Sequence, residues 1–433
     1  MAQELAASQE TKTRNRRLMA AGLLLFVFVA TRAAGAWVAD HPEHYNGGLY
    51  TTITFDPTLY EDWAHQVYHG ATPYGEVKIE YPPGSLPFMI LPVPKSAGHA
   101  YLPRFIAVML AVDVAGMAGL LVIARRTRSW WGPWTWTLLV PMLGPIAYTR
   151  LDLVPAVTII WALERAQARG WFGAGGWLGF GAVAKIYPGL LVPLLLAARW
   201  RWRWRILAGA VSVFVVCLLP FVGSLPGLWD SVVGYHTQRG LQIESTWGVA
   251  LLASGQLGHT VLPVIDHGSW NTVGAGSSTL KAISVVMSVS VLATGIWLAA
   301  KRVRPDSMAG LSAVMFGTLA LTLAVGTVFS PQFMLLLCAL GAGAASFAAR
   351  EVRVPLVLLG AANVLSQLVY PLHYNGLLAN NLLPVTAVIV RNAMVLAIGL
   401  ILFYKLWRGR FEEEAAPDAA TEPALTVAAH PVA

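Results

Sequence analysis

Charge is scarce in this chain, and hydrophobic residues take its place. Lys, Arg, Asp and Glu make up 12% of the 433 residues, about half the share of a soluble globular protein, while hydrophobic residues make up 56%. Apolar runs of roughly 20 residues recur, and each is long enough to cross about 30 Å of hydrocarbon. A soluble domain with one water-surrounded core is therefore excluded. The pattern predicts an all-α polytopic protein of the cell membrane, in contact with membrane lipids.

Cysteine and the common nucleotide motifs are also scarce or missing. Only Cys217 and Cys338 are present, and both fall inside apolar runs, which argues against a disulfide framework or a thiolate metal site. The chain has no Walker lysine loop, dinucleotide-binding glycine turn, nucleophile elbow or H-E-x-x-H pair. Its formal net charge of +8 comes from short basic clusters between apolar runs. We interpret these clusters as topology signals rather than as a nucleic-acid surface.

The basic clusters fix the predicted topology. Residues 1–17 end in a basic group and are expected to form a cytoplasmic tail. The first span, 18–38, then leads to a long outside loop at 39–100, which is expected to carry interfacial helices. Further clusters lie near 125–128, 164–169, 199–205, 301–304, 350–353 and 405–410. They fall at alternate span ends if the chain crosses the membrane about twelve times.

A count of twelve requires a break in one apolar region. Between the clusters at 164–169 and 199–205 the chain must cross twice, so we expect two short helices there. Pro188 and Gly189 disfavour a continuous helix, and the break at 185–189 places Lys185 at the outside face. One further span is expected to end at the cluster at 164–169, and the others are expected near 101–123, 130–148, 206–223, 278–300, 308–329, 331–348, 354–371 and 382–404, with a second outside loop at 224–277. The membrane domain is then 18–405, followed by a disordered cytoplasmic tail at 406–433.

This topology puts the polar segments on one face. They are Asp56 to Glu80, Arg150 with Asp152, Lys185, His236 to Glu244, Ser330-Pro331-Gln332 and His373-Tyr374-Asn375. All map to the outside, so we expect one site at the outer interface. A transporter would instead place polar residues near the membrane midplane, where this interpretation identifies only Asp113.

Two carboxylates of the first outside loop have competing interpretations. Asp56 precedes Pro57 and an amphipathic run, so it could cap an interfacial helix with proline at its first position. It could equally be a carboxylate held at the water–lipid boundary beside a lipid-bound substrate. Glu80 precedes the rigid turn Pro82-Pro83-Gly84 and either ends a loop or positions substrate.

The cations of the outside face suit a phosphate. Lys185 has no adjacent carboxylate in the sequence, and an unpaired ammonium near the membrane is costly and tends to be functional. His236 and Arg239 could hold a phosphate leaving group, although Arg239 could instead pair with Glu244 in an ordinary loop. Arg150 and Asp152 could pair at a helix end or contact sugar or phosphate.

The ordered set of segments is more specific than any one of them. Asp56 with Tyr60 and Trp63 is followed by PY at 73–74, EYPPG at 80–84, LDLVP at 151–155, AKIYP at 184–188, RGLQIES at 239–245 and SPQ at 330–332. Over about residues 15–405 this set resembles glycosyltransferase family 87, of the GT-C class of polytopic glycosyltransferases. That class includes actinobacterial mannosyltransferases acting on phosphatidylinositol mannosides. Their branch carries a histidine near the position of Phe333, so the acceptor of this chain stays open.

The resemblance implies a GT-C-type fold and a reaction. A polyprenyl-phosphate sugar, usually mannose, would be the donor, and a lipid or glycolipid on the outside would be the acceptor. Asp56 would be the general base of an inverting displacement. The expected phosphate-binding residues are Lys185, His236 and Arg239, and the expected sugar- or acceptor-binding residues are Tyr60, Glu80, Asp152, Glu244, Gln332, His373 and Tyr374. No cofactor is required and no metal ligand is assigned, while a metal on the donor phosphate stays open. Decaprenyl-phosphate arabinose as donor, or transport of a lipid-linked sugar, are the alternatives.

Overall fold

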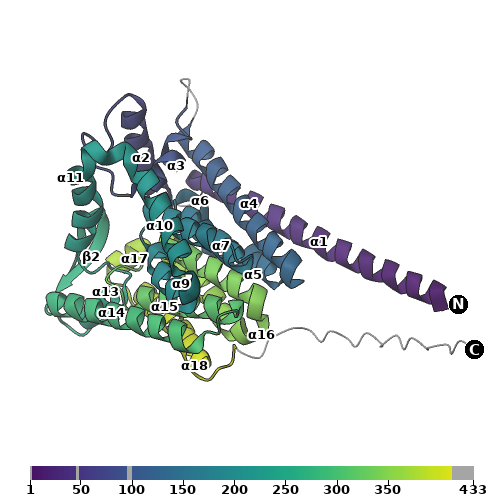
Figure 1. Cartoon of the computed structure of the whole chain (residues 1–433). Coiled ribbons are helices and arrows are strands. Elements are labelled where there is room, and N and C mark those ends of the chain that lie inside the picture. The colour runs from purple at the N-terminus through teal and green to yellow at the C-terminus, as the bar shows by residue number, and fades with distance from the viewer. Residues whose placement is uncertain (1, 45–47, 95–99, 412–433) are drawn as a thin grey trace, which may run out of the picture.

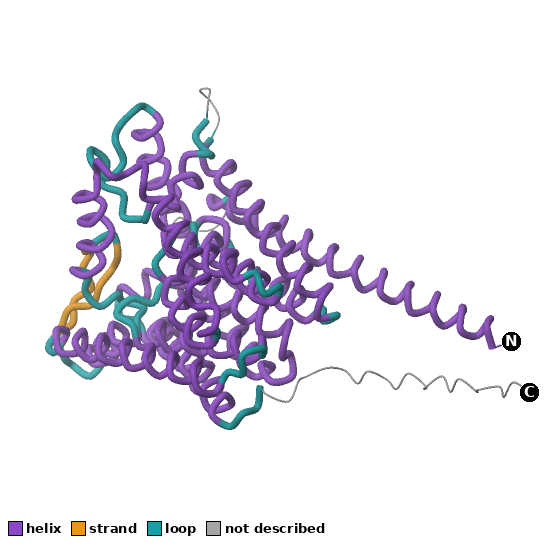
Figure 2. The backbone as a smooth tube through the Cα atoms, in the orientation of Figure 1, coloured by secondary structure: helices purple, strands orange, loops and turns teal. Residues whose placement is uncertain are grey.

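The computed structural model describes residues 2–44, 48–94 and 100–411, so the predicted tail beyond 411 lies outside the described residues. Figure 2 shows helices throughout and one orange hairpin. The helices of the first half are α1 Ala2–Asp40, α2 Gly48–Tyr68, α3 Leu86–Ile90, α4 Tyr101–Thr127, α5 Trp131–Leu139, α6 Ile146–Thr149, α7 Leu153–Gln167, α8 Trp171–Ala184, α9 Val192–Ala198 and α10 Arg203–Leu218. Those of the second half are α11 Leu225–Leu228, α12 Tyr235–Gln238, α13 Thr246–Gly255, α14 Ser277–Arg302, α15 Met308–Val325, α16 Met334–Gln367, α17 Tyr374–Leu378 and α18 Leu382–Trp407.

Seven helical segments within the described residues are long and apolar enough to cross a membrane. This confirms an all-α polytopic membrane protein. The number of twelve crossings stays a prediction, because helices such as α7 and α8 are shorter than the roughly 20 residues of a full span. The segment 331–372 is 42 residues long and bends at Ala348, whose backbone is not helical. That bend lies beside the cytoplasmic turn expected at 350–353.

The break expected at 185–189 is present. Helix α8 ends at Ala184, Lys185 has an extended backbone, and a 3-10 turn from Tyr187 leads into α9. Pro188 lies at the start of that turn, where its missing N–H is not needed. Lys185 is therefore held at a helix end rather than within a span.

The centre of the bundle is built from α15 and the first half of α16, whose residues are almost all buried. Helices α14 and α18 pack on α15, while α5 and α7 pack on α16. Helix α1 leaves this core, and its N-terminal half extends away from the other helices in Figure 1.

Asp113 holds α1 to the bundle. The carboxylate is fully buried in α4 and accepts hydrogen bonds from Arg32 of α1 at 2.9 Å, from Trp136 at 2.6 Å and from Tyr148 at 3.1 Å. A buried charge with this many donors is fully satisfied. The residue that pointed toward a transport path is thus a helix–helix contact.

The second predicted outside loop, 224–277, is folded rather than irregular. It contains a π-helical turn at Trp229–Gly234, α12, α13 and an antiparallel hairpin of β1 Val261–Asp266 and β2 Ser269–Gly274. The segment 241–243 lies along β2, because Thr272 N–H donates to Leu241 O at 2.8 Å and Ile243 N–H donates to Trp270 O at 2.9 Å. This hairpin is the exception to the all-helical prediction.

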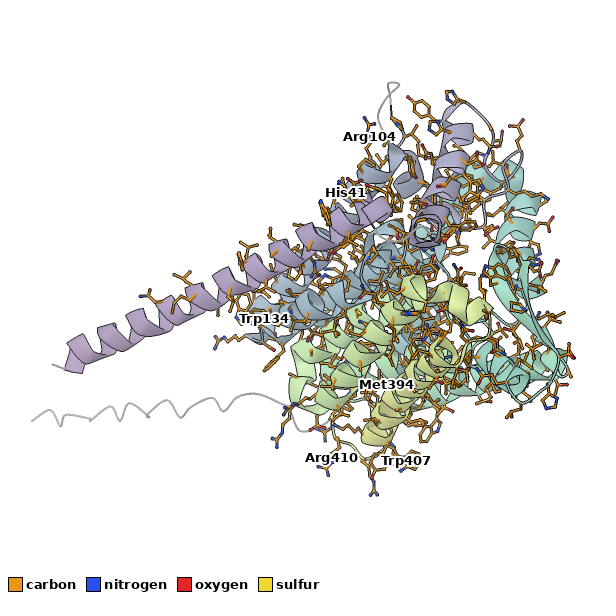
Figure 3. The ribbon with its side chains drawn as sticks, turned by 180° about the vertical axis from the view of Figure 1, so that it is seen from behind. His41, Arg104, Trp134, Met394, Trp407 and Arg410 are labelled. Carbon is orange, nitrogen blue, oxygen red and sulfur yellow. The ribbon has the colours of Figure 1, made fainter. Side chains whose placement is uncertain are left out.

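Elements from the two predicted outside loops gather at one end of the molecule. In Figure 1, α2, α11, α13 and β2 lie on the left, whereas the N-terminal end of α1 lies on the right. Figure 3, seen from behind, places His41 and Arg104 far from Trp407 and Arg410. The first two residues flank the first predicted outside loop, and the last two belong to a predicted cytoplasmic cluster. This arrangement agrees with the expected grouping of the polar segments.

Candidate active site

Asp56 lies inside helix α2, which begins at Gly48 and continues through Pro57. The expectation that Asp56 caps this helix, with Pro57 at the first helical position, is therefore wrong. The sequence suggested a helix start at the proline, but the helix has already formed two turns before it. The Asp56 carboxylate instead forms an ion pair with Arg150, and the two side chains are 17% and 5% exposed. A carboxylate and a guanidinium in so dry a place interact strongly.

Arg150 also contacts Tyr370, from a segment 220 residues away in the chain. Its Nη2 donates a hydrogen bond to the Tyr370 hydroxyl, and its guanidinium carbon lies 5.6 Å from the centre of that ring. Arg150 was weighed in the sequence but not assigned to the site. Its position in the segment before LDLVP, two residues from Asp152, was the available signal.

Two buried tyrosines complete the surroundings of Asp56. The Tyr60 hydroxyl donates to Asp56 Oδ2 at 3.4 Å and lies 2.9 Å from the Tyr81 hydroxyl. Burial raises the pKa of Tyr60 and of Tyr81 above the ordinary value, so both hydroxyls keep their protons. The structure thus places the candidate residue Tyr60 directly beside Asp56.

Asp152 and Lys185 form the second ion pair. Lys185 Nζ donates to Asp152 Oδ1 at 2.7 Å, and the ammonium faces the rings of Phe333 at 4.7 Å and Tyr81 at 5.4 Å. The alternative in which Asp152 pairs with Arg150 is not what the structure shows. Burial lowers the pKa of Lys185, and the charge of Asp152 opposes this shift. The LDLVP and AKIYP segments, which are separated in the chain, are therefore joined by the ion pair of Asp152 and Lys185.

The turn at Pro82-Pro83-Gly84 explains how Tyr81 reaches Lys185. Gly84 packs against the end of α8, where a Cβ on Gly84 would lie 2.8 Å from Val183 O. Only glycine allows two backbones to approach this closely. The close contact holds the first predicted outside loop against Val183, at the end of α8 before Lys185.

Arg239 and Glu80 lie beside these pairs. The Arg239 guanidinium lies 5.6 Å from the ring centre of Tyr235, and its Nε is buried without a hydrogen-bond partner among the described residues. Burial raises the pKa of Glu80, while a hydrogen bond from Tyr235 and the charge of Arg239 oppose the shift. The charge of Arg239 also acts on Lys185 and Tyr187, which places it in the same cluster.

Glu244 does not pair with Arg239. Its carboxylate is 1% exposed and lies 2.9 Å from Nη1 of Arg391, a fully buried residue of α18. Arg391 and Asn392 fall inside the span predicted at 382–404, so the interpretation that Asp113 alone lies deep within a span is wrong. An arginine in the middle of an apolar run was the signal that could have found this pair.

The remaining candidate residues lie at varying distances from this cluster. Ser330 Oγ donates to the Gln332 side chain, and the Tyr374 ring packs edge-on against Tyr370 with centres 5.0 Å apart. His373 directly precedes α17, and its Nδ1 lies 2.9 Å from the backbone oxygen of Leu368. The side chain of His236 lies outside the described residues.

The site is therefore a set of ion pairs lined by tyrosines. It combines a carboxylate, Asp56, that could accept a proton with cations, Lys185 and Arg239, that could bind a phosphate. Among the described residues no three His, Cys, Asp or Glu side chains form a group suited to a metal ion.

The seven long apolar helices among the described residues define a polytopic membrane protein. The sequence profile of glycosyltransferase family 87 matches residues 80–331, more than half of the chain. The chain belongs to glycosyltransferase family 87 and is a membrane glycosyltransferase. A comparison with curated proteins gave no match.

Proposed function

We propose that this enzyme transfers mannose from a polyprenyl-phosphate donor to a lipid or glycolipid acceptor at the outer face of the cell membrane. The observation that carries this proposal is the juxtaposition of Asp56 and Arg150 with Asp152 and Lys185. It puts a candidate base and several cations together at the end of the molecule where the predicted outside loops meet.

In the proposed reaction Asp56 removes the proton from an acceptor hydroxyl. The hydroxyl oxygen attacks the anomeric carbon of the donor, the bond from that carbon to the phosphate oxygen breaks, and the electron pair leaves with the polyprenyl phosphate. Attack from the side opposite the leaving group inverts the anomeric configuration. A phosphate is already a good leaving group, so the protein needs cations rather than a strong acid.

The cations divide into two kinds. Arg239 has a buried Nε with no hydrogen-bond partner among the described residues, which suits a phosphate oxygen. Lys185 is held by Asp152 and faces two aromatic rings, so a phosphate would add to an ammonium already fixed in place. His236 is the third proposed phosphate ligand. Glu80, Asp152, Glu244, Gln332, His373, Tyr60 and Tyr374 keep their proposed sugar or acceptor roles, and for Asp152 and Glu244 these act through their ion-pair partners.

The transporter alternative has less support. The buried charged side chains Arg32, Asp113 and Arg391, which lie within spans, are paired with other buried groups rather than spaced along a path. A different sugar donor remains compatible with the same fold, because none of the contacts described reads the stereochemistry of a sugar.

The decisive measurement is transfer of radiolabelled mannose from polyprenyl-phosphate-mannose to membrane lipid. We expect Asp56→Asn to reduce transfer about 100-fold or more, because the amide cannot accept the acceptor proton. Asp62→Asn is the matched control. Asp62 lies on the same helix and is exposed, and among the described residues its carboxylate accepts a hydrogen bond from Gln66.

Each outcome of this measurement is informative. Full transfer by Asp56→Asn would show that Asp56 is not the base. Transfer from decaprenyl-phosphate arabinose and not from the mannose donor would replace the proposed sugar. Movement of labelled lipid across the bilayer without any transfer would favour the transporter.

A further inference from the structure

Arg391 makes an unusually complete set of contacts for an arginine inside a membrane span. It is fully buried in α18, and all three of its nitrogens donate hydrogen bonds. Nη1 donates to Glu244 Oε2 at 2.9 Å, Nη2 to Glu244 O at 2.7 Å and to Phe329 O at 3.2 Å, and Nε to Asn392 Oδ1 at 2.9 Å. The guanidinium carbon also lies 4.5 Å from the centre of the Phe329 ring.

These contacts join two loops that do not follow each other in the chain. Gln242 N–H donates to Thr327 O at 2.9 Å, and Phe329 N–H donates to the Gln242 side-chain oxygen at 2.7 Å. Asn392 Nδ2 adds a bond to Glu244 O at 3.1 Å. The segment 241–245 and the segment 327–329 are therefore bound to each other and to α18 at the same point.

Both loops lead directly into the proposed site. Arg239 lies three residues before Gln242, and Ser330 with Gln332 follows Phe329 in the chain. The charge of Arg150 also acts on Glu244, so the buried pair is close to the pair that holds Asp56. A shift of the first loop would move Arg239, a proposed phosphate ligand. A shift of the second would move Gln332, a proposed sugar or acceptor ligand.

Stability alone is a poor explanation for such a pair. Burying an ion pair costs nearly as much desolvation as the charges return, and apolar replacements of similar volume are often as stable. What the pair supplies is a fixed geometry. The planar guanidinium group directs its N–H donors in fixed directions, so its partners must lie in one arrangement.

We propose that Arg391 is a positioning residue, which holds the loops 239–245 and 327–332 in the geometry that binds the donor phosphate. This inference rests on the proposed polyprenyl-phosphate donor. Arg391 does not touch the substrate itself; it acts through Glu244 and Phe329. A substitution far from the reacting atoms that displaces a substrate-binding group by about 1 Å is enough to lower the rate about 100-fold.

The test compares three variants in lipid nanodiscs, with binding of decaprenyl phosphate and transfer from polyprenyl-phosphate-mannose as readouts. Arg391→Lys keeps the charge and loses the fork, and we expect its Kd for decaprenyl phosphate and its KM for the donor to rise about 10- to 100-fold. The expected change in kcat is smaller, because Asp56 is untouched. The double variant Glu244→Gln with Arg391→Gln removes both buried charges and keeps amide groups at both positions, and we expect it to fold and to bind the donor as weakly as Arg391→Lys.

Arg32→Lys is the matched control. Arg32 is another buried arginine within a span, paired with Asp113, but it holds α1 rather than the loops of the site. We expect this variant to lower Tm while leaving the donor KM within about twofold of the native value, as a purely structural pair should.

The outcomes separate this inference from the proposed function. If the native protein neither binds decaprenyl phosphate nor transfers mannose, the proposed donor is wrong and the inference falls with it. If the native protein binds the probe and Arg391→Lys binds it equally well, the donor stands and the positioning role is overturned. Equal effects of Arg391→Lys and Arg32→Lys on donor KM would also overturn it.

Discussion

At the scale of single residues, the site is defined by which charges are paired. The contact with Arg150 occupies the Asp56 carboxylate, which must accept a proton in the proposed reaction. The same guanidinium donates to Tyr370. Arg150 is therefore suited to share its hydrogen bonds between Asp56 and an incoming phosphate.

The first prediction concerns this contact. We expect Arg150→Gln to lower the rate of transfer about 100-fold or more, because it removes the positive charge that would stabilise both the Asp56 carboxylate and the departing phosphate. Tyr370→Phe removes only a hydroxyl that accepts from Arg150, and we expect a loss of about 10-fold. Initial rates at saturating donor measure both. A native rate in Arg150→Gln would show that the contact has no part in catalysis.

The second prediction concerns the pH dependence of donor binding. Burial lowers the pKa of Lys185 below its ordinary value of 10.5, while Asp152 opposes the shift and Arg150 and Arg239 add to it. A lysine with a lowered pKa loses its charge earlier as the pH rises. We therefore expect kcat/KM for the donor to fall on the alkaline side before pH 10.5 is reached.

Lys185→Arg separates this group from others that titrate. The guanidinium stays charged, so the alkaline fall should move to higher pH even if the rate at neutral pH is reduced. The tyrosines around Lys185, Tyr81 and Tyr187, have pKa values raised by burial and should not titrate in this range. An unchanged alkaline limb in Lys185→Arg would assign it to another residue.

Among the elements, the break at 185–189 and the first predicted outside loop depend on each other. Lys185 reaches the site only because α8 ends before it, and Tyr81 reaches Lys185 only because the Pro-Pro-Gly turn packs on α8. Gly84 is the point of contact.

The third prediction is that Gly84→Ala separates these elements. The added Cβ would lie 2.8 Å from the backbone oxygen of Val183, which cannot turn aside as a side chain could. We expect a destabilisation of about 1–3 kcal/mol and a loss of transfer. Gly223→Ala is the control, because its Cβ would meet nothing within 4 Å. Thermal unfolding and transfer by the two variants should differ; if they match, the close approach is not needed.

In the whole molecule, the helices place the polar loops at one end and the N-terminal end of α1 at the other (Figure 1). Positively charged clusters predict that the termini are cytoplasmic. The site would then face outward, where a lipid-borne donor and a lipid acceptor can both reach it.

The fourth prediction tests this orientation by cysteine labelling in a background without Cys217 and Cys338. Asp62→Cys and Gln238→Cys are at exposed positions near the site, and we expect a membrane-impermeant reagent to label both in intact cells. Arg125→Cys, exposed at the end of α4, should be labelled only after the membrane is opened. Labelling of Arg125→Cys in intact cells would reverse the proposed orientation.

The class of protein, the family and most of the polar segments follow from the amino-acid sequence alone. Apolar length, basic clusters and the order of motifs such as EYPPG and AKIYP are properties of neighbouring residues, which is why the break at Lys185 could be predicted. The expected cap at Asp56 failed because the proline gave a plausible helix start, while nothing local marked the two earlier turns of α2.

Only the tertiary structure decided which charges meet. Asp56 pairs with Arg150, Asp152 with Lys185 and Glu244 with Arg391. Closeness in the sequence had instead suggested Arg150 for Asp152 and Arg239 for Glu244, and no partner for Asp56. Partners separated by 33 to 147 residues are chosen by helix packing and by the cost of leaving a buried charge alone. The Asp56 carboxylate and the cation Lys185 were visible in the sequence, whereas the pairing of Asp56 with Arg150 was decided by the fold.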